Sequence, residues 1–198
     1  MTSERAFDAA YYQRYYLDPR SRAVSQSDMD LLGQMIAVQM RRLGLPVRRI
    51  LDAGCGLGLL RRSLLAAYPR ARYIGLEVSE YLCERMGWVQ ASVVDYRARA
   101  PFDLVICHDV PQYLDDGAAA RAIRNLASLC RGALYFHVPT EEDRRENIDP
   151  SGTDTNVHWR AADWYQRRLR RHFLHTGLGL HVRRDVPVVQ WALERPWR

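Results

Sequence analysis

Apolar and polar positions along this chain alternate in blocks that predict strands separated by helices. Short apolar runs with the length and composition of buried strands occupy residues 47–53, 73–77, 89–94, 103–107 and 133–138. Segments with apolar residues at helical spacing lie between several of these runs, at 59–68, 79–86 and 118–129. Because repeated strand–helix–strand order is typical of a parallel sheet covered by helices on both faces, we predict an α/β fold with a doubly wound sheet.

The segments that flank this alternating region predict other elements. Before it, a tyrosine cluster occupies residues 5–22, and a helix begins at Ser27 and ends near Gly44. After it, a polar stretch leads to a predicted helix over 161–175, which Gly177 and Gly179 would end. The two apolar runs that follow, 180–184 and 188–193, are close enough in sequence to form a hairpin.

The composition excludes several classes of protein. The formal charge is +6, but all 29 basic residues are arginines spread along the chain, which is unlike a nucleic-acid-binding patch. Charged residues interrupt every apolar stretch before it reaches the about 18 residues of a membrane helix. The first residues, Met1 to Arg5, also lack the basic-then-apolar order of a secretory signal. We therefore expect a cytoplasmic protein that uses neither nucleic acid nor membrane as its partner.

The four cysteines give no sign of a disulfide or a metal site. Cys55, Cys83, Cys107 and Cys130 are far apart in the sequence and show no C-x-x-C spacing. No histidine or aspartate lies at the spacing of a zinc site beside them. The sequence predicts reduced thiols and no bound metal.

A glycine-rich turn after the first apolar run carries the clearest functional signal. Residues 50–58 read Ile-Leu-Asp-Ala-Gly-Cys-Gly-Leu-Gly, and glycines in this pattern let the backbone approach a ligand closely. A dinucleotide fold requires G-x-G-x-x-G, but residue 59 is leucine. A phosphate-binding P-loop requires a lysine, and the chain has none. The loop predicts a ligand that is neither NAD nor a nucleotide held by a P-loop.

The acidic strand end followed by G-x-G-x-G resembles the first signature of class I S-adenosylmethionine-dependent methyltransferases. Glu77 ends the next predicted strand, 19 positions after Gly58, and Asp95 ends the third. Residues 102–108 look like the fourth strand of that family, and the terminal hairpin looks like its antiparallel seventh strand beside the fifth. The resemblance covers residues 47–194 and implies a mostly parallel, seven-stranded sheet with an antiparallel last strand.

The same resemblance implies S-adenosyl-L-methionine as the cofactor and S-adenosyl-L-homocysteine as its product. Gly54, Cys55 and Gly56 would line the methionine part of the donor, in the loop that Gly58 closes. Asp52 would fix this loop or reach the donor's amino group through water.

The resemblance also assigns the adenosine part of the donor. Glu77 would hold the ribose, and Asp95 would accept a hydrogen bond from the adenine amino group. Val78 and Val94 would enclose the adenine ring with apolar surface. His108 would lie beside the sulfonium through its backbone.

The candidates for acid–base chemistry follow the fourth strand and the polar stretch beyond residue 139. Methyl transfer from a sulfonium chiefly requires alignment, and a base need only take a proton from the acceptor. His108, Asp109 and His158 are the candidate catalytic residues, and His137 is a further histidine near this edge. The turn Asp-Val-Pro-Gln-Tyr at 109–113 matches the motif of base-amine methyltransferases only in part and is closer to the small-molecule branch.

We expect one domain over residues 1–198, in three parts. Residues 1–46 form amino-terminal helices and a lid, 47–138 the donor-binding half, and 139–198 the acceptor loop and terminal hairpin. Tyr16 lies four positions after Tyr12, so both would face the donor from one helix face.

The acceptor expected from the aromatic and basic residues of the lid and loop is a small aromatic or anionic molecule. An RNA methyltransferase and a donor-binding protein without catalysis remain alternatives. The sequence leaves the oligomeric state open.

Overall fold

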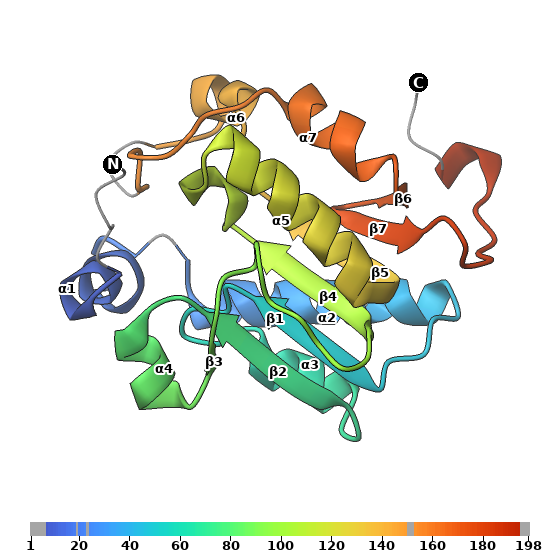
Figure 1. Cartoon of the computed structure of the whole chain (residues 1–198), viewed down its shortest axis with the longest axis horizontal. Helices are drawn as coiled ribbons and strands as arrows, with labels where there is room; N and C mark the ends of the chain where they lie inside the picture. The colour runs from blue at the N-terminus through green and yellow to red at the C-terminus, as the bar shows by residue number, and fades with distance from the viewer. Residues whose placement is uncertain (1–6, 19, 23, 150–152, 195–198) are drawn as a thin grey trace.

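The computed structural model describes residues 7–18, 20–22, 24–149 and 153–194. Its centre is a seven-stranded sheet with the order β3-β2-β1-β4-β5-β7-β6 (Figure 1). The strands are β1 (Arg49–Ala53), β2 (Arg72–Glu77), β3 (Val89–Gln90), β4 (Phe102–His108), β5 (Cys130–His137), β6 (Phe173–Gly177) and β7 (Leu180–Arg183). Strands β1 to β5 pair in parallel, and β7 is antiparallel to both β5 and β6. The predicted doubly wound sheet with an antiparallel strand beside the fifth is confirmed.

Helices cover both faces of this sheet. On one face α2 (Gln26–Arg42) and α3 (Arg61–Ala67) bury Ile36, Met40 and Leu64 against β1 and β4. On the other face α5 (Asp116–Leu129) and α7 (Ala162–Leu169) pack onto β4 and β5 (Figure 1). The remaining helices are α1 (Ala9–Tyr12), α4 (Glu80–Met86), α6 (Glu141–Glu146), the π-helix η1 (Gln13–Leu17) and the 3-10 helices η2 (Pro111–Tyr113) and η3 (Ala192–Glu194). None of the described helices is long and apolar enough to cross a membrane.

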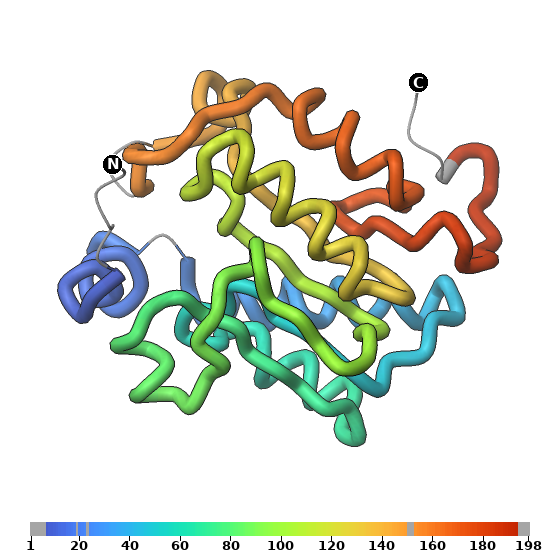
Figure 2. Tube along the Cα trace, in the orientation of Figure 1, coloured from blue at the N-terminus to red at the C-terminus, as the bar shows by residue number. Residues whose placement is uncertain are grey.

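The amino-terminal helices and the last described residues lie at opposite ends of the molecule. In Figure 2 the blue segment that holds α1 and η1 lies beside the carboxyl ends of the first strands, and the red segment with η3 lies far from it. Residues 1–6 of the predicted lid, 150–152 of the predicted acceptor loop and 195–198 of the predicted domain lie outside the described residues.

Two predicted elements are wrong in the carboxy-terminal part. The helix predicted over 161–175 ends at Leu169, and Phe173–Gly177 is strand β6 instead. Gly177 and Gly179 have φ of +99° and +79°, so these glycines form the turn between β6 and β7 and do not end a helix. The hairpin is therefore made by β6 and β7, and residues 188–193 form no strand. The predicted third strand is also shorter, since β3 ends at Gln90.

A buried arginine fixes the long connection between β5 and α7. The Arg160 side chain is 5% exposed and donates to the carboxylate of Asp116 and to the carbonyls of Pro111 and Leu114. It also donates to the hydroxyl of Tyr165, which ties α7 to the same network. These bonds hold the connection against η2 and the start of α5, next to the carboxyl ends of β4 and β5.

We predict that Arg160→Ala lowers the free energy of unfolding by about 3 kcal/mol, because it leaves buried carbonyls without their donor. Urea unfolding followed by circular dichroism measures this change. Arg145→Ala, which removes an exposed arginine from α6, is the control and should cost less than about 0.5 kcal/mol. Equal losses in the two variants would contradict the role of Arg160.

Candidate functional site

Two adjoining cavities open at the carboxyl ends of the parallel strands. The first has a volume of about 150 Å³ and the second about 80 Å³. Four residues line both cavities: Tyr16, Gly54, Gly56 and Asp109. The two cavities are therefore halves of one elongated site that passes over the glycine loop. This position agrees with the rule that ligands of open α/β sheets bind beyond the carboxyl ends of the strands.

The glycine loop is built for close contact with a ligand. Gly54 and Gly56 have φ of +77° and +51°, in the left-handed region that favours glycine. The N–H groups of Gly54 and Cys55 donate to the carbonyl of Leu76 at 2.7 and 3.0 Å, which anchors the loop to β2. A Cβ at Gly54 would lie 2.2 Å from Val110, whereas one at Gly56 would meet no atom within 4 Å. The open side of Gly56 leaves the backbone accessible to a ligand.

Glu77 joins the end of β2 to this loop. Its carboxylate is 5% exposed and accepts hydrogen bonds from the N–H groups of Gly56 at 2.9 Å, Val78 at 2.8 Å and Ser79 at 3.1 Å. An ionised carboxylate has about four acceptor positions, so roughly one remains for a ligand hydroxyl. Glu77 lines the first cavity, and Val78, 49% exposed, lines it beside Glu77.

Asp52 is a buried acid in the second cavity. Its side chain is 4% exposed and accepts a hydrogen bond from the hydroxyl of Tyr73. Burial raises the pKa of Asp52 to about 6, although the bond from Tyr73 acts in the opposite direction. Cys55 lines the same cavity, and burial raises the pKa of its thiol far enough that the proton stays on sulfur. Asp52 is therefore an acid that a cationic ligand group would keep ionised.

Aromatic side chains from the amino-terminal helices cover the first cavity. Phe7, Tyr11, Tyr12 and Tyr16 all line it, and the hydroxyl of Tyr11 lies 2.9 Å from that of Tyr113 in η2. Burial raises the pKa of Tyr16, and the carboxylate of Asp109 acts in the same direction, so its hydroxyl stays protonated. Among the described residues this hydroxyl makes no hydrogen bond, which leaves its donor free at the junction of the two cavities.

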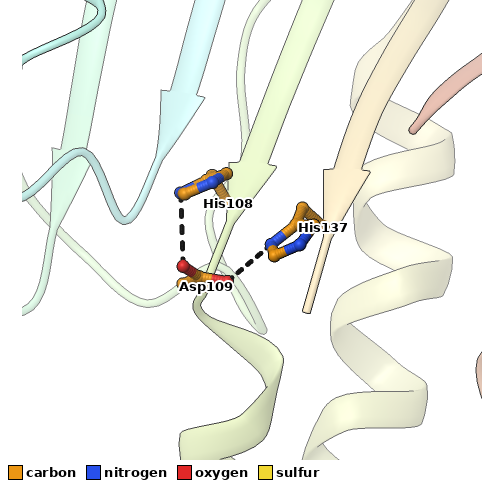
Figure 3. A group of neighbouring side chains, drawn as sticks. All are labelled: His108, Asp109 and His137. Atoms are coloured by element: carbon orange, nitrogen blue, oxygen red, sulfur yellow. Dashed lines mark hydrogen bonds and ion pairs between the residues drawn. The ribbon is translucent and has the colours of Figure 1, made fainter. Parts of the chain in front are cut away.

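A carboxylate between two imidazoles lies at the same junction. Asp109 Oδ1 accepts from Nδ1 of His137 at 2.7 Å, and Oδ2 lies 3.6 Å from Nδ1 of His108 (Figure 3). The two imidazole rings are stacked with centroids 5.0 Å apart. Asp109 has a φ of +55°, a left-handed conformation that is uncommon outside glycine. This conformation turns the carboxylate back toward the ends of β4 and β5.

The three side chains of this cluster shift one another's pKa. Burial alone would raise the pKa of Asp109, but His108 and His137 lower it on balance, so the carboxylate is ionised at neutral pH. Burial lowers the pKa of His108, and the hydrogen bond to Asp109 raises that of His137. The ligand atoms of the three side chains all lie within 4.8 Å of one another, close enough for a metal ion to fit among them. The prediction that the protein binds no metal stays a prediction.

The comparisons with known proteins agree with this geometry. Residues 51–132, from β1 to the beginning of β5, match the family model described as a methyltransferase domain. The fold resembles magnesium protoporphyrin IX methyltransferase from Synechocystis with bound S-adenosylhomocysteine, with a TM-score of 0.63 and 20% identity over 89% of this chain and 96% of that one. It also resembles a sugar N-methyltransferase from Streptoalloteichus, with a TM-score of 0.61 and 18% identity over 84% and 91%. Residues 51–132 therefore belong to a methyltransferase domain, and the sheet has the fold of class I methyltransferases.

Two curated relatives also align with this methyltransferase domain. Trans-aconitate 2-methyltransferase of Azoarcus is 27% identical over 143 residues, which are 62% of this chain and 56% of the relative. A malonyl-[acyl-carrier protein] O-methyltransferase of Legionella pneumophila is 31% identical over 117 residues, 53% of this chain and 41% of the relative. The chain spans about half the length of the curated relatives that it matches.

The structure brings most of the predicted site residues to the two cavities of the methyltransferase domain. The lining includes ten of them: Tyr16, Asp52, Gly54, Cys55, Gly56, Glu77, Val78, His108 and Asp109, with Tyr12 from the predicted lid. Gly58 lies outside the lining, because the space beside its Cα is filled by Trp88, whose ring N–H donates to the carbonyl of Gly56 at 2.9 Å. Gly58 thus supports the loop from behind.

Three other predicted residues do not reach the cavities. Val94 is buried in the core and Asp95 is exposed, and neither lines a cavity of the site. Ser92 and Val93 line the first cavity instead of Val94 and Asp95. His158 is exposed, and its backbone N–H donates to the carbonyl of Gln112.

Several residues of the site have no signal in the sequence pattern. Ser92 and Val93 follow a strand that is shorter than predicted, so their positions could not be counted from its end. The sequence places Tyr113 in a turn, but it gives no sign that its hydroxyl contacts that of Tyr11, 102 residues earlier. Trp88 supports the loop from behind, and a tryptophan before a strand gives no signal of contact with a glycine 32 residues earlier.

We predict that Asp52 makes the stability of the ligand-free protein depend on pH. Its pKa is about 6 in the folded protein against 3.8 for an unperturbed aspartate, so its ionisation destabilises the fold as the pH rises through this window. The substitution Asp52→Asn should therefore raise the free energy of unfolding more at pH 7.5 than at pH 4, by about 2.4 kcal/mol. Asp95→Asn, at an exposed position, is the control. An Asp52→Asn effect that is the same at both pH values would contradict this prediction.

Proposed function

We propose that this protein transfers a methyl group from S-adenosylmethionine to a small protic acceptor, an amine or a hydroxyl compound. The observation that carries the proposal is the junction of the two cavities, where Tyr16 and Asp109 face the glycine loop. A donor that occupied both cavities would place its sulfonium at this junction. The reacting methyl would then lie beside the two side chains that can bind and orient an acceptor.

The shape and lining of the cavities support this placement of the donor. The first cavity is lined by Leu76, Val78, Val93 and aromatic rings, which suit a flat adenine. Glu77 in the same wall has capacity left for a ribose hydroxyl. The second cavity contains Asp52 and Cys55 beside the open face of Gly56, which suits the amino acid part.

The charges around the junction favour a cationic donor and disfavour an anionic acceptor. The lining of the two cavities contains three acids, Asp52, Glu77 and Asp109, and no arginine. A sulfonium gains from these carboxylates, whereas a carboxylate or phosphate acceptor would be repelled by them. Of the two kinds of acceptor that the sequence suggested, we therefore propose an aromatic molecule and not an anionic one. The same charges argue against an RNA substrate.

The cluster of Asp109 and its two histidines would accept the proton that the acceptor loses on methylation. The donor supplies a methyl already activated for displacement, so the protein must align the nucleophile and accept its proton. Asp109 is ionised and points to the junction, where it can take that proton from an amine or hydroxyl. His137 holds one oxygen of the carboxylate and leaves the other directed toward His108 and the cavity.

The aromatic lid contributes by excluding water. Phe7, Tyr11 and Tyr113 form edge-to-face contacts at 5.1 and 5.3 Å over the first cavity. A cover of this kind keeps the reacting atoms dry, which strengthens the electrostatic contacts inside. The free hydroxyl of Tyr16 can then donate to the acceptor or to the donor's carboxylate.

We predict that the protein binds S-adenosylhomocysteine in a calorimetric titration and shows no binding heat with NAD. Glu77→Ala should weaken the binding of S-adenosylhomocysteine by about 1–3 kcal/mol, the usual loss for a hydrogen bond to a charged group. Glu80→Ala, in the exposed first turn of α4, is the control and should leave the affinity unchanged. Binding of NAD without heat from S-adenosylhomocysteine would refute the proposed donor.

We predict that Asp109→Asn lowers turnover by about 10²–10⁴-fold and leaves the affinity for S-adenosylhomocysteine nearly unchanged. Asparagine has the same shape and tolerates the left-handed backbone, so the variant removes the charge and keeps the geometry. Formation of S-adenosylhomocysteine with a metabolite extract, and then with pure amines and phenols, measures the turnover. Asp115→Asn, on the exposed cap of α5, is the control. No turnover by the wild-type protein with any extract would favour a donor-binding protein without catalysis.

A further inference from the structure

A third cavity opens near the far edge of the sheet, and its lining includes His137, the residue that holds Asp109. It has a volume of about 500 Å³, larger than either half of the donor site. It opens between α7 and the strands β5, β6 and β7, where Figure 1 shows α7 above the β6–β7 edge. None of its lining residues lines the donor cavities.

The floor of this cavity is aromatic and apolar. Phe136, Tyr165 and Phe173 supply three rings from β5, α7 and β6, and Val138 and Leu169 complete the floor. Each of these five side chains belongs to the hydrophobic core. A cavity with such a floor and a few polar groups at its rim has the usual composition of a small-molecule site.

The rim carries a cation without an acidic partner. Arg170 directly follows α7 and lines the cavity, and among the described residues its guanidinium makes no ion pair and no hydrogen bond. Arg167 on the same helix is paired with Asp163. No aspartate or glutamate lines the cavity, so the positive charge of Arg170 is not compensated there.

Two neutral imidazoles extend the polar rim. The rings of His175 and His181 are stacked with centroids 4.8 Å apart, one from each strand of the hairpin. Burial lowers the pKa of both, that of His181 to about 3, so each ring is neutral and keeps one N–H donor. Among the described residues neither ring makes a hydrogen bond.

We propose that this cavity binds an aromatic anion, a carboxylate or sulfonate carried by a ring system. The ring lies against Phe136, Tyr165 and Phe173, and the acidic group meets the guanidinium of Arg170 and the N–H groups of the histidine pair. Guanidinium groups match planar oxyanions well, and the aromatic floor selects a flat apolar body. This cavity shares no lining residue with the two donor cavities, although His137 connects it to Asp109, and the proposal does not depend on the proposed function.

Fluorescence titration with 8-anilino-1-naphthalenesulfonate, an aromatic sulfonate, tests the proposal on the full-length protein saturated with S-adenosylhomocysteine. N-phenyl-1-naphthylamine, which lacks the sulfonate, is the neutral counterpart. Arg170→Glu should lower the affinity for the sulfonate at least about tenfold and change the affinity for the neutral probe by less than about twofold. Gln166→Trp places a large ring at the exposed rim of the cavity, so it should lower the affinity for both probes.

Arg167→Glu is the matched control, since Arg167 lies on the same helix but does not line the cavity. It should leave both affinities within about twofold of the wild type, and thermal unfolding should show that all variants fold. Equal weakening by Arg170→Glu and Arg167→Glu would overturn the proposal, because it would show a general charge effect. Unchanged binding of both probes in Gln166→Trp would also overturn it, because the probes would then lie elsewhere.

Discussion

The donor site depends on one buried carboxylate, that of Glu77. Three backbone N–H groups surround it, and one of them belongs to Gly56 in the loop after β1. A buried charge without such partners would cost several kcal/mol, so the loop and the turn after β2 must keep the conformation that supplies them. The same interaction that stabilises the acid therefore fixes the glycine loop relative to β2. Because the carboxylate keeps about one free acceptor position, the side chain that fixes the loop is also the one that we propose holds the ribose of the donor.

The parallel sheet explains why groups from distant parts of the sequence meet at this loop. The strands β1, β2 and β4 end at the same edge with Ala53, Glu77 and His108, and the residues that follow each strand form the walls of the site. The amino-terminal helices approach from outside the sheet and are held by contacts between aromatic rings, such as Phe7 with Tyr113. Hydrogen bonds add to these ring contacts, since the hydroxyl of Ser79 donates to the carbonyl of Phe7 and the hydroxyls of Tyr11 and Tyr113 lie 2.9 Å apart.

The sequence predicted the parts of the site whose positions depend on the chain's own pattern. The glycine loop, Glu77 and His108 follow strand ends directly, so counting along an apolar run places them. Asp95 could not be placed in this way, because β3 ends at Gln90 and a turn follows. Asn125 of α5 donates to the carbonyls of Val93 and Tyr96, so a contact from a distant part of the sequence holds the turn in which Asp95 is exposed.

The error in the terminal hairpin has a similar origin. Gly177 and Gly179 suit the end of a helix as well as a tight turn, and the arginine-rich segment before them has helical propensity. The alternation of buried and exposed positions in β6 is short, so periodicity alone does not distinguish the two cases. Residues 173–177 form a strand because they pair with β7, which itself pairs with β5.

The left-handed backbone of Asp109 connects the fold to the proposed chemistry. Such a conformation costs roughly 1 kcal/mol or more for a residue other than glycine, and it persists where the surroundings determine it. Here the N–H of Asp109 donates to the carbonyl of His137 at 3.0 Å, and its carboxylate accepts from the imidazole of the same residue. Backbone and side chain of His137 thus hold both ends of Asp109, which fixes the carboxylate at the junction of the cavities. The conformation is thus held by contacts to the end of β5, and it keeps the carboxylate at the position where we propose that the acceptor gives up its proton.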